Sequence, residues 1–234
     1  MPSFTNALIV GAGSGLSASL ARLFARNGIA VSLAARNTGK LEGLASETAG
    51  TAYLCDVGDA AAVSGLFAAL DGDERTPDLV VYNPSARERG PLTDLDPARV
   101  ENAIRISAYG GFLVAQEAVK RMLPKHHGAV LFTGASASVK GYAQSAPFAM
   151  GKFALRGLAQ SMARELHPKG IHIGHFVIDG GIRNPERPER IDPDNNPDSM
   201  LDPDAIAEAY WNLLNQHRSA WTSEVELRPW VERF

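Results

Sequence analysis

The stretch ALIVGAGSGLSASLARLFARNG, residues 7–28, decides the fold. It joins an apolar run at 6–10 to a helical pattern at 16–27 through a turn that contains Gly11, Gly13 and Gly15. A short apolar run bounded by glycines is typical of a buried strand, and glycine at position 28 is typical of the residue just past a helix. A strand, a glycine-rich turn and a helix in direct succession predict the beginning of a βαβ unit.

The same alternation of short apolar runs and longer helical patterns continues along the chain, which favours a parallel sheet. We expect an α/β fold with a Rossmann-type doubly wound parallel sheet of about seven strands, helices on both faces, and a single domain over residues 1–234. A charged, proline-rich stretch at 183–202 predicts a substrate lid. Strands are expected at 6–10, 29–35, 52–54, 78–82, 129–133, 171–178 and 223–227, and helices at 16–27, 40–48, 60–70, 106–123, 147–167 and 203–217.

Composition excludes several classes of function. The 234 residues are 45% hydrophobic and 21% charged, with a formal net charge of -3. No strongly basic block is present, which argues against nucleic acid as a partner. Cys55 is the single cysteine, so we expect no internal disulfide and no metal site. No signal-peptide pattern and no apolar run of about 18 residues is found. We therefore expect a cytoplasmic protein that does not bind membranes.

The glycine-rich turn predicts a dinucleotide site at residues 11–16, with Gly11, Gly13, Ser14, Gly15 and Leu16 as its binding residues. Glycines let the backbone turn sharply and approach a pyrophosphate, while the helix N-terminus offers free N–H groups and a partial positive charge. Such a turn is a weak signal alone, but its position after the first strand of a βαβ pattern strengthens it. The alternative, a tight turn without a ligand, is less favoured.

Four segments in the same order resemble the short-chain dehydrogenase/reductase family. The spacing Gly11-x-x-x-Gly15-x-Ser17 is similar to that family's Gly-x-x-x-Gly-x-Gly, with serine at the third glycine. The resemblance implies that Asp56, followed by Val57, binds the adenine and that Asn83 in YNPS supports the adenosine. It also implies that the turn containing Asp179, Gly180 and Ile182 meets the nicotinamide.

The same resemblance implies a catalytic set of tyrosine, lysine, serine and asparagine, of which this chain retains one member. Lys152 is present and would hold the nicotinamide ribose. Phe148 stands at the tyrosine position, Ala135 at the serine position and Ser107 at the asparagine position, while Ser136 is a possible substitute for the lost serine. The pattern resembles a divergent branch of the family with an incomplete glycine motif.

Cofactor choice depends on the residue that follows the second strand. An acidic residue there would bind the ribose hydroxyls of NAD and repel a 2′-phosphate, whereas this strand is followed by Arg36. Arginine pairs bidentately with phosphate, so we expect NADP in preference to NAD. The alternative is an ordinary surface arginine.

Two functions remain open at this stage. The first is an NADP-dependent oxidoreductase that transfers hydride to or from an unidentified carbonyl, alcohol or activated alkene through a non-standard site. The second is an inactive NAD(P)-binding protein, either a redox sensor or a partner subunit of an active relative. The family resemblance also implies a homodimer or homotetramer. The substrate cannot be derived from these residues.

Overall fold

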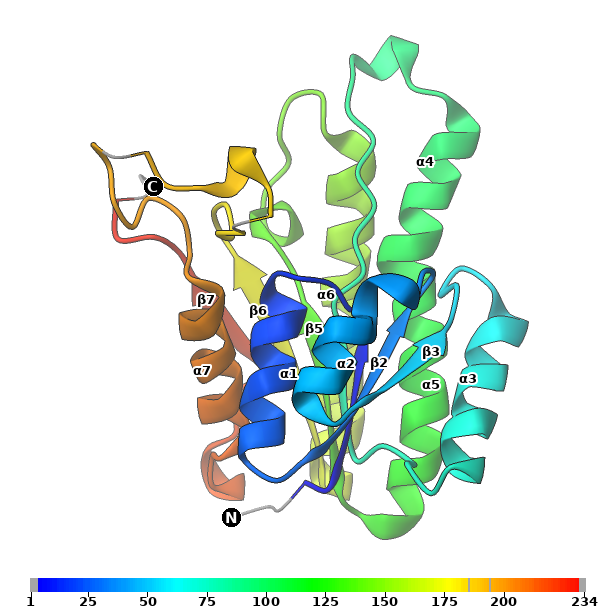
Figure 1. The fold of residues 1–234 in the computed structure, drawn as a ribbon. Coiled ribbons are helices and arrows are strands. Elements are labelled where there is room, and N and C mark those ends of the chain that lie inside the picture. Colours follow the sequence, from blue (N-terminus) through cyan, green and yellow to red (C-terminus); the bar gives the residue numbers. More distant parts are fainter. Residues whose placement is uncertain (1–3, 185, 194, 232–234) are drawn as a thin grey trace.

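The computed structural model describes residues 4–184, 186–193 and 195–231. Its centre is a seven-stranded sheet in the order β3-β2-β1-β4-β5-β6-β7, and every neighbouring pair is parallel (Figure 1). The expected fold class is thereby confirmed. The strands are β1 (Asn6–Val10), β2 (Ala30–Ala35), β3 (Thr51–Leu54), β4 (Leu79–Tyr82), β5 (Gly128–Thr133), β6 (Ile171–Ile178) and β7 (Glu224–Leu227).

Helices cover both faces of the sheet because the strand side chains alternate between two apolar cores. Ile9 belongs to the core beneath α1 and α7, whereas its neighbour Leu8 belongs to the core beneath α3, α5 and α6. Figure 1 shows these two helical layers on either side of the strands. The helices are α1 (Leu16–Arg26), α2 (Glu42–Thr48), α3 (Ala60–Gly72), α4 (Pro97–Ile104), α5 (Gly110–Met122), α6 (Ala146–Leu166) and α7 (Pro203–Leu214).

The helix expected at 106–123 begins about nine residues earlier than predicted. Asp96 caps α4 by accepting a hydrogen bond from the Ala98 backbone N–H, and Pro97 occupies the first turn. Both are favoured residues for a helix start. A π-helical turn at Arg105–Tyr109 then joins α4 to α5 without a break. The Asp-Pro start signal and the short helix that follows it were therefore not predicted.

The sheet order creates a crevice between β1 and β4. After β1 the chain continues into α1 on one face of the sheet. After β4 it continues into α4 and α5 on the other face. The loops that follow these two adjacent strands therefore diverge. In doubly wound sheets such a switch point, at the carboxyl ends of the strands, is where ligands bind. Among the residues that the structure describes, no helix has the length and apolar character needed to cross a membrane.

Helix α6 packs closely on the π-helical turn, which sets the position of the lysine at 152. A Cβ atom added at Gly151 would lie 2.7 Å from the Cβ of Ser107, a fully buried residue. The contact leaves no room for a methyl group, so glycine is required at this position on steric grounds.

We therefore expect Gly151→Ala to lower the free energy of unfolding by about 1–3 kcal/mol, the usual cost of an overpacked core. Gly65→Ala in α3 is the matched control because a Cβ there would meet no atom within 4 Å. Removing glycine from an open helical position stabilises by about 0.5–1 kcal/mol. Urea unfolding measures the free energy of unfolding of both variants. Equal values for the two would contradict the predicted close contact.

Candidate active site

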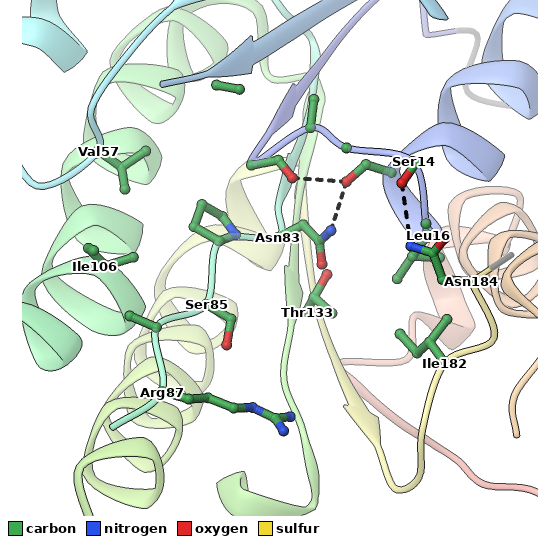
Figure 2. Close-up of a pocket in the computed structure, with 18 of the residues that line it drawn as sticks. Ser14, Leu16, Val57, Asn83, Ser85, Arg87, Ile106, Thr133, Ile182 and Asn184 are labelled. Atoms are coloured by element: carbon green, nitrogen blue, oxygen red, sulfur yellow. Dashed lines mark hydrogen bonds between the residues drawn. The ribbon is translucent and has the colours of Figure 1, made fainter. Parts of the chain in front are cut away.

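A cavity of about 1150 Å³ opens at the carboxyl edge of the sheet. Its walls come from the loops that follow the strands, because all the strands are parallel and end at the same edge. Figure 2 shows side chains from these loops converging on one space from both sides. The lining includes Gly11–Ser17, Arg36, Lys40, Cys55–Val57, Asn83–Arg87, Thr133–Ala135, Phe148, Lys152, Gly180, Ile182–Asn184, Glu186, Arg187 and Arg190.

The glycine-rich turn leaves free space where a phosphate group would lie. Gly11 adopts a positive φ of 76°, and a Cβ there would lie 2.7 Å from the Pro84 nitrogen. A Cβ at Gly13 would meet no atom within 4 Å, so the backbone at this point faces open space. The turn therefore fits an extended phosphate-bearing ligand next to the N-terminus of α1.

Serine at the third glycine position has a structural role in this chain. The Ser17 hydroxyl donates to the Gly11 carbonyl oxygen at 3.1 Å and accepts from Nδ2 of Asn83 at 2.7 Å (Figure 2). Ser17 is 2% exposed, so its side chain does not fill the open space beside Gly13. The hydroxyl thus joins the turn after β1 to the loop after β4 and orients Asn83.

The residues assigned to the adenosine end line the same cavity. Arg36 follows β2 and, with Lys40, gives this end a positive charge; within the described residues, neither forms an ion pair. The Asp56 carboxylate accepts the Gly58 backbone N–H at 2.9 Å, so it caps its own turn while also lining the cavity beside Val57. These groups, with the glycine-rich turn, fit a dinucleotide.

Apolar groups occupy the two positions where the family resemblance predicts a tyrosine and a serine. Phe148, Ala135 and Ala137 pack together as a small buried cluster, and Phe148 and Ala135 line the cavity. Phe148 is 6% exposed and can neither donate nor accept a proton. The structure thus brings together the two positions that the sequence aligned, and neither carries a reactive group.

Lys152 is the titratable group at the centre of this wall. It is 2% exposed, and its Nζ donates to the Thr133 carbonyl oxygen at 2.7 Å. Burial, and then the positive charge of Arg87, lower the pKa of Lys152 to about 7. Desolvation disfavours the charged ammonium, and no carboxylate among the described residues forms an ion pair with it. A lysine with this pKa exchanges protons readily at neutral pH.

Three other predicted site residues lie outside the set of described residues that line the cavity. The Ser107 hydroxyl is buried and bonds to the Ala86 backbone. Ser136 begins a short turn whose backbone carbonyl accepts from Val139 and Lys140. The Asp179 carboxylate forms ion pairs with Lys140 at 3.4 Å and Arg228 at 3.9 Å. Its neighbours Gly180 and Ile182 do line the cavity.

Several residues of the loop at 183–202 line the cavity, while Pro185 and Asp194 of this loop lie outside the described residues. Arg183 pairs with Asp192, Asp198 and Asp202, which organises the loop. Asn184 reaches across to the Ser14 hydroxyl at 3.4 Å (Figure 2). The loop therefore contacts the glycine-rich turn, and its role as a substrate lid stays a prediction.

Sequence reasoning missed Arg87, Thr133 and Arg190, all of which line the cavity. The signal for Arg87 was available, since the basic residues of 87–89 follow YNPS within a loop at the carboxyl edge. Thr133 contributes a backbone carbonyl, which no side-chain pattern reveals. Arg190 enters the cavity only because of the path of the loop at 183–202.

A family model described as short chain dehydrogenase matches residues 5–187. The chain belongs to this family. The match begins just before β1, includes the glycine-rich turn, Asn83, Phe148 and Lys152, and ends within the loop at 183–202. The chain is thus a member of an oxidoreductase family.

Similar proteins agree with this family assignment. D-threitol dehydrogenase of Mycolicibacterium smegmatis is 27% identical over 172 residues, covering 71% of this chain and 66% of that protein. The 3-oxoacyl-[acyl-carrier-protein] reductase MabA of Mycobacterium tuberculosis is 28% identical, covering 68% and 62%. The chain thus spans less than two thirds of these curated relatives.

Solved structures agree over almost the whole chain. A short-chain dehydrogenase from Rhodopseudomonas palustris is 32% identical, with a TM-score of 0.82 and coverage of 97% of this chain and 99% of that one. A metagenomic short-chain oxidoreductase in complex with NADP is 23% identical, with a TM-score of 0.83 and coverage of 96% and 97%. The latter likeness concerns the fold.

The lowered pKa of Lys152 has a consequence for stability. A lysine in an unfolded chain has a pKa of roughly 10.4, so the unfolded chain holds this proton up to a higher pH than the folded chain does. Folding therefore releases the proton between pH about 7 and about 10.4, and the free energy of unfolding rises with pH across that window.

We expect this rise to disappear in Lys152→Met, which keeps the length of the side chain and removes the charge. Urea unfolding of both proteins at a series of pH values measures the difference. The stability of the wild type relative to the variant should increase from pH about 7 upward and level off near pH 10. Parallel pH profiles for the two proteins would show that Lys152 keeps an ordinary pKa in the folded chain.

Proposed function

We propose that this family member is an NADP-dependent oxidoreductase that acts on a carbonyl, an alcohol or an activated alkene, with Lys152 as the group that exchanges the proton. The observation that carries the proposal is one continuous cavity joining the glycine-rich turn and Arg36 to Lys152. The NADP-bound state of a structure with the same fold is consistent with it.

The cofactor would be held by the groups that already fit it. Gly13 offers open space beside the N-terminus of α1, Asn83 is oriented by Ser17, and Arg36 offers a guanidinium at the adenosine end. Arginine binds a phosphate with two parallel hydrogen bonds, which favours a 2′-phosphate over a hydroxyl. When bound, NADPH supplies hydride.

Lys152 would supply the proton that a tyrosine supplies in other family members. In the reductive direction its ammonium gives one proton from Nζ to the substrate and becomes a neutral amine, which water reprotonates. A group whose pKa is near the working pH combines a useful protonated fraction with a low cost of transfer. Because the pKa of Lys152 is about 7, the protonated fraction of this lysine falls as pH rises above that value.

An activated alkene suits this site better than an unactivated carbonyl. Phe148 and Ala135 provide no hydroxyl to polarise a carbonyl oxygen, so the oxygen receives less help as negative charge develops on it. When hydride adds to an activated alkene, the negative charge is stabilised by the electron-withdrawing group of the substrate itself.

The first test is titration with NADPH and NADH, followed by cofactor fluorescence. We expect NADPH to bind more tightly, and Arg36→Ala to weaken NADPH binding by about tenfold or more, since a hydrogen-bonded charge contributes about 1.5–3 kcal/mol. NADH affinity should stay unchanged. Arg26→Ala, at the exposed end of α1, is the charge-matched control. Equal affinities of the wild type for the two cofactors would remove the NADP preference.

Turnover on a panel of carbonyls, alcohols and activated alkenes completes this test. Reduction should slow as pH rises through about 7, and Lys152→Met should lower the rate by about 10² to 10⁴. Cofactor bound without turnover of any substrate would instead assign this chain the role of an inactive NAD(P)-binding protein.

We further propose that a second copy of the chain covers the outer face of α5 and α6. Tyr109, Phe112, Met150 and Phe153 are between 42% and 53% exposed there, and the first two stack on each other. A Cβ atom added at Gly157 in α6 would meet no atom within 4 Å, so another helix can approach this face closely. A homodimer or homotetramer would bury these apolar side chains.

Sedimentation of Met150→Glu tests the assembly, because a charge buried in an apolar interface is costly. We expect the wild type to sediment as a dimer or larger and the variant as a monomer. Leu54→Glu is the control, since Leu54 is 72% exposed and ends β3, the edge strand that β2 and β1 separate from the strands on which α5 and α6 pack. A monomeric wild type would refute the proposed interface.

A further inference from the structure

Arg87 extends into the cavity from the loop after β4 (Figure 2). Its guanidinium carbon lies 4.2 Å from the centroid of the Phe148 ring, which is the geometry of a stacked cation–π pair. A guanidinium lying flat on a ring keeps its N–H edge free, and that edge is the part that binds oxyanions bidentately. Phenylalanine at position 148 therefore presents an arginine to the cavity.

A second guanidinium lines the same cavity from the loop at 183–202. Arg190 ends a short helical turn at Pro188–Arg190, where its backbone bonds to Asn184 and Arg187. Its Nη1 lies over the turn at Gly181, 3.1 Å from the place of a Cβ at that glycine. Burial, and then the charges of Arg190 and Arg89, lower the pKa of Arg87. Two segments about a hundred residues apart thus place like charges in one cavity.

The described residues provide no counter-charge for this pair. The ion pairs among them include neither Arg87 nor Arg190, while the acids Asp192, Asp198 and Asp202 are engaged by Arg183. The cavity wall is strongly cationic as a whole. Its described basic residues are Arg36, Lys40, Arg87, Lys152, Arg183, Arg187 and Arg190, and its described acidic residues are Asp56 and Glu186.

The phosphates of a dinucleotide would not account for Arg87. The open space at Gly13 and the Arg36 side chain both lie at the glycine-rich end. Arg87 instead stacks on Phe148, whose ring centroid is 6.0 Å from Nζ of Lys152. Like charges held together without a partner cost free energy, and a bound anion would offset that cost.

We propose that Arg87 and Arg190 bind an anionic group of the substrate, a carboxylate or a phosphate, and so place its reacting carbon beside Lys152. This inference rests on the proposed oxidoreductase function and adds the substrate class. The substrate is a small carbonyl, alcohol or alkene that carries a compact oxyanion. Neutral analogues lack the group that neutralises the two guanidinium groups, so they bind weakly.

Paired ligands that differ in this one charge provide the test. Acetoacetate is compared with methyl acetoacetate, and dihydroxyacetone phosphate with dihydroxyacetone, by calorimetric titration of the full chain with and without NADPH. We expect the charged member of at least one pair to bind about ten- to a hundredfold more tightly than the neutral member. The pair that shows the preference distinguishes carboxylate from phosphate.

The variants Arg87→Gln and Arg190→Gln should each abolish this preference while leaving NADPH affinity unchanged. Arg89→Gln is the matched control because it removes the same charge from the same loop but lies outside the described residues that line the cavity. It should retain the preference. If Arg87→Gln does not fold, Arg190→Gln still tests the proposal, because Arg190 lies on a surface loop and does not pack on the buried ring of Phe148.

Equal binding of charged and neutral ligands by the wild type would overturn the proposal. The proposal would also be overturned if the wild type showed no preference for the charged ligand and Arg87→Gln lost affinity for NADPH. That result would assign Arg87 to the cofactor. The NADPH titration without a second ligand reports on the proposed function alone. A protein that does not bind NADPH can therefore be distinguished from one that does not prefer an anion. The preference for the anion is measured in the cofactor-free protein as well.

Discussion

The Ser17 hydroxyl is the contact on which the site depends, because it joins the loops after two adjacent strands. It donates to the Gly11 carbonyl and accepts from the Asn83 amide, while Pro84 lies so close to Gly11 that no Cβ fits between them. Those loops diverge at the switch point of the sheet, and this contact holds their bases together. The loop after β4 therefore leaves in one defined direction, which carries Arg87 over Phe148.

Replacement of the tyrosine position changes the electrostatics of the cavity as well as its chemistry. Phe148 provides an apolar ring on which Arg87 stacks, and the ring packs against Ala135 and Ala137. Lys152 is buried beneath this wall with the Thr133 carbonyl as its partner, so its pKa falls. Burial and a nearby cation act in the same direction, because both disfavour the charged ammonium.

Much of the fold could be predicted because its signals are local. The apolar run of β1, the glycines that follow it and the alternation of strands and helices lie within short windows of sequence, and all seven strands were expected within two residues of their observed ends. The start of α4 at Pro97 was overlooked because its helix is short and continues into α5 through a π-helical turn. The presence of Arg87 and Arg190 in one cavity could not be predicted, since they lie on two loops whose paths depend on tertiary contacts.

The sequence by itself determined the fold class, the family and the identity of the groups at positions 148, 135 and 152, because these depend on residue types at fixed spacing. Tertiary structure decided what those groups can do. A lysine acquires a pKa of about 7 only when helix packing removes it from water, and the proposed anion site needs two arginines from distant segments to line one cavity. Both properties arise from the electric field and solvent exposure of the assembled chain, which spacing along the sequence does not specify.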